Sequence, residues 1–278
     1  MYRQRSNSRI CPDEPLLEGK NVLVTGGTAG VGEFVSRGLL RRGAQVVSLS
    51  RGVSQGKAEL SEVQSIKCDL SDLHSVTDAV EQIKDRQFDV LICNSGIWLP
   101  EKKLTASGIE MTFAVNVLGH HLLYQLMFRH RLFAEDARII MTTGEAYVVT
   151  DHCDANPEVY KRSEAYGGTK LGNLWQMREL VRRCANVRAY AVHPGVILSG
   201  FGGFPDNSFR HWLAGNFLIS EDQGAQAALI AATQDLPNGT YWHNVCGVMN
   251  LPDNDPSMNT RKSADFWDEL EELTAAYR

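Results

Sequence analysis

The stretch that most restricts the fold of this chain is TGGTAGVG, residues 25–32. It follows the apolar run 21–24 and leads into an amphipathic stretch that begins at Glu33. A strand, a glycine turn and a helix start, in that order, form a dinucleotide-binding unit whose backbone N–H groups face a pyrophosphate. A side chain at Gly30 would hold the diphosphate away, and one at Gly32 would push the helix off the strand. The alternative is an ordinary glycine-rich turn, because such motifs also arise by chance.

Length and composition favour one α/β domain. With 278 residues, 43% of them hydrophobic, the chain can build one large core without a second domain. The net charge of −5 gives no footprint for nucleic acid. The six cysteines have no CxxC spacing, which favours reduced, mostly buried thiols. Residues 1–17 are polar, so we expect a flexible lead without a secretory signal, and residues 18–278 as the domain.

The chain holds no run of about 18 apolar residues, so no membrane span is expected. With neither a span nor a signal, we expect a cytoplasmic location, and peripheral membrane contact stays open. The expected partner is a small-molecule substrate, rather than nucleic acid, for which the net charge of −5 gives no footprint.

The end of the second predicted strand, 44–51, selects the cofactor. An acidic residue there would bind the ribose 2′-OH of NAD, whereas an arginine accommodates the 2′-phosphate of NADP. Ser50 and Arg51 stand at this point, so NADP(H) is favoured over NAD(H). The alternative is that Arg51 is a solvated loop charge.

Strands and helices alternate along the rest of the chain. Strands are expected at 63–70, 88–93, 138–143 and 187–192, with a short last one within 241–249. Helices are expected at 71–85, with Ser71 as its N-cap, and at 105–131, 164–184, 221–233 and 262–277. This order predicts a Rossmann-type doubly wound α/β fold. The aromatic-rich segment 196–217 is expected to form an apolar substrate lid, or else to pack as a satellite core.

Tyr166 and Lys170 lie four residues apart on a predicted helix and so share one face. An ammonium one turn away stabilises a phenolate and lowers the pKa of the tyrosine. The YxxxK pattern alone is weak, but its place after a fifth strand, behind a nucleotide turn, favours chemistry. Asn116 interrupts an apolar helix face, where it serves either the core or the reaction.

Several landmarks together resemble the classical short-chain dehydrogenases/reductases, in the branch of the retinol dehydrogenases and the WW-domain oxidoreductase. They are TGGTAGVG, CDL at 68–70, CNSG at 93–96, TASGIEMTFAVNVLGHH from 105, AYGGTKLGN from 165 and VHPG at 192–195. The resemblance covers residues 18–275. It implies a single domain with a parallel seven-stranded sheet and a catalytic tetrad of Asn, Ser, Tyr and Lys. The family also often pairs subunits through its fourth and fifth connecting helices, which implies a homodimer or homotetramer.

The resemblance assigns roles to individual residues. Tyr166 matches the proton-transferring tyrosine, Lys170 the lysine that holds the nicotinamide ribose, and Asn116 the asparagine that keeps a relay water. Asp69 matches an adenine contact. The expected cofactor-binding residues are Gly26, Thr28, Gly30, Val31, Gly32, Ser50, Arg51, Asp69, Leu70, Asn94, Gly96, Tyr166, Lys170, Pro194, Gly195 and Val196.

The fourth member of the tetrad does not match. An ungapped match of the fifth strand puts Gly144 where the family has its catalytic serine. A hydroxyl is needed there to bind the substrate oxygen, so Thr143 is the expected stand-in. Thr142 should point to the other face of the strand.

The sequence thus predicts an NADP(H)-dependent oxidoreductase that moves a hydride between nicotinamide and a carbonyl or alcohol on a largely apolar small molecule. No metal site is expected. The alternative is a nucleotide-binding protein with little turnover that acts as a redox sensor or partner-binding module. Gly144 and the long loop after it keep that alternative open.

Overall fold

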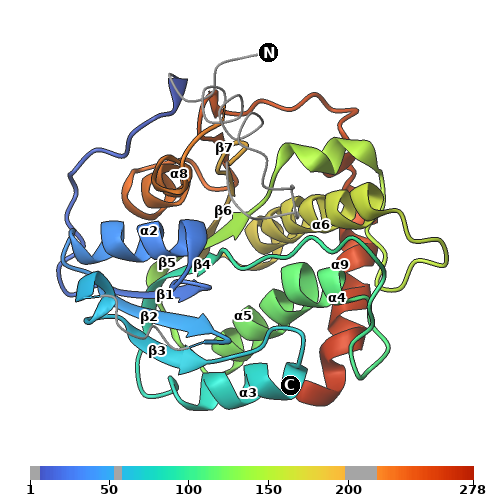
Figure 1. Cartoon of the computed structure of the whole chain (residues 1–278), viewed down its shortest axis with the longest axis horizontal. Helices are drawn as coiled ribbons and strands as arrows, with labels where there is room; N and C mark the ends of the chain where they lie inside the picture. Colours follow the sequence, from blue (N-terminus) through green and yellow to red (C-terminus); the bar gives the residue numbers. More distant parts are fainter. Residues whose placement is uncertain (1–6, 53–57, 198–217) are drawn as a thin grey trace, which may run out of the picture.

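A parallel β-sheet forms the centre of the computed structural model, which describes residues 7–52, 58–197 and 218–278 (Figure 1). The strand order is β3-β2-β1-β4-β5-β6-β7-β8. The strands are β1 (Asn21–Thr25), β2 (Gln45–Ser50), β3 (Gln64–Lys67), β4 (Phe88–Cys93), β5 (Phe133–Thr142), β6 (Val187–His193), β7 (Tyr241–His243) and β8 (Gly247–Val248). The predicted Rossmann-type fold is confirmed. The expected seven strands become eight, because β8 turns back and pairs antiparallel with β7.

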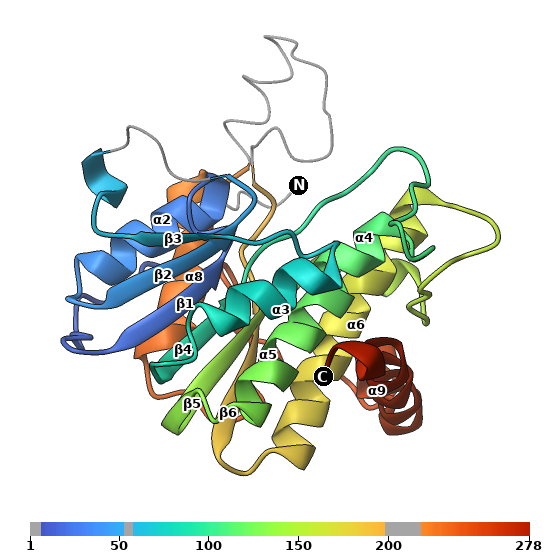
Figure 2. The same ribbon diagram turned by 90° about the horizontal axis from the view of Figure 1, so that it is seen from below.

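Helices cover both faces of the sheet, as Figure 2 shows. Helices α2 (Gly30–Leu40) and α8 (Glu221–Thr233) lie on one face. Helices α3 (Leu73–Glu81), α5 (Gly119–Arg129) and α6 (Arg162–Arg183) lie on the other, with α9 (Thr260–Thr274) packed outside α6. Each face has its own apolar cluster. The central strands are therefore almost continuously apolar, as a sheet covered on both sides requires.

The helix predicted over 105–131 is broken in the structure. Leu104 and Glu110 first form an isolated bridge, and the Glu110 carboxylate then caps the three-residue α4 (Met111–Phe113). A π-helical segment, η2 (Ala114–Leu118), leads into α5. The Thr105 hydroxyl accepts the N–H of Ile109, which closes a local turn instead of a helix start.

The start of α3 differs from the prediction because the side chains near it form other hydrogen bonds than expected. Asp72, not Ser71, caps α3, since its carboxylate accepts the N–H of His74. The Ser71 hydroxyl donates instead to Asp69. The loop before α6 holds a short 3₁₀ turn, η3 (Glu145–Val149), directly after β5.

The first described residues lie against α8 and against the end of α2. The N–H of Cys11 donates to Gln226 on α8, and Arg42 donates to the carbonyl of Pro12. The flexible lead and the domain boundary at residue 18 remain predictions, and residues 1–6 lie outside the described part. The expected lid falls almost entirely on 198–217, which also lies outside it. All six cysteines are unpaired. In the described ranges, no helix combines the length and apolarity that a membrane span needs.

Candidate active site

The glycine turn joins β1 to α2 with the geometry that a phosphate cradle needs. Gly26 and Gly30 have φ values of +68° and +55°, which favour glycine. A Cβ on Gly32 would lie 2.1 Å from the carbonyl oxygen of Gly26, so only glycine lets the helix approach the strand this closely. Ala29 at the start of α2 provides no side-chain cap, which leaves the first N–H groups of the helix for a ligand.

One cavity of about 1070 Å³ extends from this turn along the carboxyl ends of the strands. It lies at the switch point where β1 is flanked by β2 and β4, the usual ligand site of doubly wound sheets. All sixteen residues expected to bind the cofactor line it, and so does Thr143. Asn116 does not line it, although its neighbour Val115 does.

The end of β2 carries no acidic side chain toward the cavity. Ser50 is held by local bonds, since Thr28 donates to its hydroxyl and Ser50 donates to the carbonyl of Gly52. Arg51 is exposed at the cavity wall. Asp69 accepts two hydrogen bonds from Ser71, so its carboxylate is fixed at the edge of the cavity.

Tyr166 and Lys170 lie on the cavity side of α6. The Lys170 Nζ lies 5.2 Å from the centroid of the Tyr166 ring and donates to the carbonyl of Thr142 at 3.3 Å. Trp98 stacks on Tyr166 with ring centroids 5.0 Å apart, and the Arg162 guanidinium covers Trp98 at 4.3 Å from its centroid. The phenol is thus held between an aromatic ring and an ammonium group.

Burial dominates the electrostatics of this pair. It raises the pKa of Tyr166 and lowers the pKa of Lys170 to about 8. Burial thus raises the pKa of Tyr166 in the protein alone, where a lowering by the lysine was expected. A neutral phenol beside a mostly charged ammonium is the resulting state near neutral pH.

The side chain of Asn116 forms hydrogen bonds to two segments near Tyr166. Its side-chain carbonyl accepts the N–H of Ile97 at 2.8 Å, and its amide donates to the Ile97 carbonyl and to the hydroxyl of Thr169, each at 3.0 Å. The π-helical segment η2 carries this side chain, a feature that often marks functional sites. Asn116 thus connects the chain after β4 to helix α6, which carries Tyr166.

The hydroxyl of Thr143, the expected substrate-binding group, already has a hydrogen-bond acceptor in the protein. This hydroxyl is buried and donates to the backbone carbonyl of Lys170 at 2.7 Å. Gly144, by contrast, has open space: a Cβ there would meet only Lys170 Cγ at 3.9 Å and His193 Nε2 at 4.0 Å. Its φ of −176° suits any residue.

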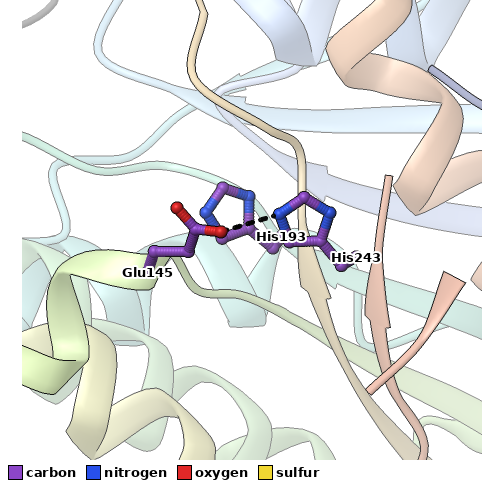
Figure 3. Close-up of side chains that lie close together, drawn as sticks. All are labelled: Glu145, His193 and His243. Atoms are coloured by element: carbon purple, nitrogen blue, oxygen red, sulfur yellow. Dashed lines mark hydrogen bonds and ion pairs between the residues drawn. The ribbon is translucent and has the colours of Figure 1, made fainter. Parts of the chain in front are cut away.

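Sequence reasoning missed a polar cluster beside Gly144, formed by Glu145, His193 and His243 (Figure 3). His193 and His243 end two neighbouring strands and are paired in register. The proline and glycine after His193 marked it only as a strand end, so no local signal pointed to His243 or Glu145. Trp98 was missed for the same reason.

Residues 20–203 match the family model described as short chain dehydrogenase. The retinol dehydrogenase 12 of Mus musculus is 34% identical over 256 residues, which are 84% of this chain and 80% of that protein. The WW domain-containing oxidoreductase of Gallus gallus is 28% identical and matches 83% of this chain and 63% of its own length. A solved structure from Mycobacterium paratuberculosis is 27% identical, with a TM-score of 0.75, and covers 96% of this chain and 98% of its own.

Proposed function

The chain belongs to the short-chain dehydrogenase family, in the branch of the retinol dehydrogenases, and we propose that it is an NADP(H)-dependent enzyme that reduces the carbonyl group of apolar small molecules. That it is an NAD(P)-dependent dehydrogenase or reductase follows from its family and its relatives. The observation that carries the proposal is the position of Tyr166 and Lys170 on the wall of the cavity that begins at the glycine turn.

The cavity fits a nicotinamide dinucleotide. The absent side chain at Gly32 and the uncapped start of α2 suit the pyrophosphate. Lys170, on the wall of the same cavity, would hold the nicotinamide ribose. A bound cofactor of this kind supplies or accepts the hydride. The hydroxyl of Tyr166 gives its proton to the carbonyl oxygen in reduction and takes one from the alcohol in oxidation. Its raised pKa supports the reductive direction, because the phenol stays protonated.

Three further observations support the cofactor preference and the substrate class. Arg51 stands at the end of β2, where an acid would favour NAD. Apolar side chains line the cavity, namely Ile97, Trp98, Val115 and Ile197, and Trp98 stacks directly on Tyr166. A relative is named a retinol dehydrogenase, after an apolar alcohol. The cytoplasmic location and the homo-oligomeric state remain predictions, the second open to light scattering.

The test compares oxidation of NADPH and NADH, followed by the absorbance of the reduced nicotinamide, with decanal, acetophenone and menadione. We expect faster turnover with NADPH, and a loss of about 10²- to 10⁴-fold in Tyr166→Phe with NADPH binding preserved. Tyr160→Phe is the matched control, because its hydroxyl donates to the Leu99 carbonyl outside the cavity. Tight NADPH binding without turnover on any carbonyl would instead support a nucleotide-binding sensor.

A further inference from the structure

The polar cluster beside Gly144 carries one more inference. The rings of His193 and His243 stack with centroids 4.4 Å apart, and both are buried. Glu145 begins the 3₁₀ turn after Gly144, and its carboxylate accepts from His243 Nε2 at 3.2 Å (Figure 3). His193 and Glu145 also line the cavity, together with Tyr166.

Backbone hydrogen bonds define the tautomer of both histidines. Nδ1 of His193 accepts the N–H of Gly195 at 2.7 Å, and Nδ1 of His243 accepts those of Val245 and Cys246 at 3.0 and 3.2 Å. A nitrogen that accepts carries no proton, so each neutral ring holds its proton on Nε2. Burial, followed by the neighbouring His243, lowers the pKa of His193 to about 3, which keeps the ring neutral.

The same bonds argue against a metal ion, although the three side chains offer ligand atoms within 4.8 Å of one another. A metal at Nε2 needs the lone pair there, so the proton would have to move to Nδ1. At Nδ1 it would oppose a backbone N–H that already points at the ring. The cluster is therefore built from two hydrogen-bond donors and one acceptor.

Nε2 of His193 lies beside open space in the active site. It is 4.0 Å from where a Cβ on Gly144 would be, so it borders the volume that a side chain at this position would fill, and His193 lines the cavity. Among the described residues, none hydrogen bonds to this atom, whereas the hydroxyl of Thr143 is engaged by Lys170. A donor left without a partner at a cavity wall is suited to an oxygen of a ligand.

We propose that His193 Nε2–H donates a hydrogen bond to the carbonyl oxygen of the substrate, in the space that Gly144 leaves open. The assignment rests on the proposed carbonyl reduction and names the group that orients the oxygen for the proton of Tyr166. His193 keeps its own proton throughout. The bond between His243 and Glu145 holds the ring stacked on His193, so these two are positioning residues.

The first test measures kcat, KM and NADPH affinity in His193→Ala, Gly144→Ser and the double variant. We expect His193→Ala to lose about 10²- to 10³-fold in kcat, the usual effect of one such donor, with NADPH affinity unchanged. Gly144→Ser added to His193→Ala should restore at least about tenfold, because its hydroxyl enters the same space. His193→Gln, which keeps an N–H donor, should retain more activity than alanine. His74→Ala, on the exposed side of α3, is the control.

A second test does not depend on turnover. NMR of the imidazole nitrogens should show His193 neutral, with its proton on Nε2, and this resonance should shift when cyclohexanone is added to the protein with NADP⁺. A proton on Nδ1, a charged ring near neutral pH or an unshifted resonance would overturn the assignment.

The two proposals fail in different ways. Wild-type turnover that does not depend on Tyr166 refutes the proposed function, and the NMR result still decides the role of His193. Normal turnover in His193→Ala, with Tyr166 still required, refutes the role of His193 alone.

Discussion

Gly32→Ala tests whether the close approach of α2 to β1 builds the cofactor site. The added methyl would lie 2.1 Å from the carbonyl oxygen of Gly26 and 2.6 Å from Asn94 Nδ2. The backbone carbonyl cannot rotate away as a long side chain could. Helix and strand must therefore separate by about 1.3 Å, the difference between 2.1 Å and ordinary contact at 3.4 Å.

The cost follows from what this separation disturbs. Overpacking of a core by one methyl group costs about 1 to 3 kcal/mol, and we expect the upper end because the clash is with backbone. The first turn of α2 would also move relative to the pyrophosphate, so NADPH affinity should fall by more than about tenfold, or about 1.4 kcal/mol.

Urea unfolding measures the first effect, and NADPH fluorescence titration measures the second. Gly52→Ala is the matched control for the unfolding measurement: nothing lies within 4 Å of its added Cβ, and its backbone has no left-handed φ. The reasoning is refuted if Gly32→Ala unfolds within about 0.5 kcal/mol of the wild type and binds NADPH with the same affinity.

Three other perturbations have defined outcomes. Arg51→Ala should weaken NADPH binding by about tenfold and leave NADH binding unchanged, because an arginine at the end of β2 would bind the 2′-phosphate, which NADH lacks. Equal losses for both cofactors in titrations would contradict this. Burial lowers the pKa of Lys170 to about 8, so we expect kcat/KM for reduction to fall as the pH rises through that value, because the ammonium loses its proton. A pH profile of kcat/KM that is flat across that range would argue against this role of Lys170. Glu179→Ala should lower the free energy of unfolding in urea by about 2 to 3 kcal/mol, because its buried carboxylate joins Arg183 on α6 to Ser263 on α9. Glu272→Ala, at an exposed position, is the control. If Glu179→Ala is as stable as this control, Glu179 does not join the two helices.

Local sequence patterns were sufficient to predict the fold, the glycine turn and the pair of Tyr166 and Lys170. The glycine turn and the spacing of Tyr166 and Lys170 depend on a few adjacent residues, so the sequence displays them directly. The last predicted strand, within 241–249, is two strands in the structure, β7 and β8, and segments of two or three residues show no periodicity that would separate them. The break in 105–131 was missed because the true helix start lies inside the predicted stretch, where the carboxylate of Glu110 caps it.

The rest of the site depends on partners that are distant in sequence. Thr143 was predicted because it has a hydroxyl. That hydroxyl can donate to a substrate only if it has no other acceptor, and in the structure it donates to the backbone carbonyl of Lys170. His193 and His243 are 50 positions apart and meet only because β6 pairs with β7. Alternation within one strand cannot reveal such a pairing, so the donor beside Gly144 became visible only with the sheet register.

The hydrogen bonds of residues 9–12, before β1, also bear on the order in which parts of the chain fold during synthesis. The N–H of Arg9 donates to Asn244, and that of Cys11 to Gln226, a residue 215 positions later. Domains fold as the chain emerges from the ribosome, and contacts between distant positions form late. The segment around Cys11 leaves the ribosome early, yet its partners on α8 and after β7 are among the last to be made. Its bonds to Arg42 can form early, because that residue follows only about 30 positions later. Its docking against α8 and the residue after β7 must wait for the end of translation and is one of the closing steps of folding.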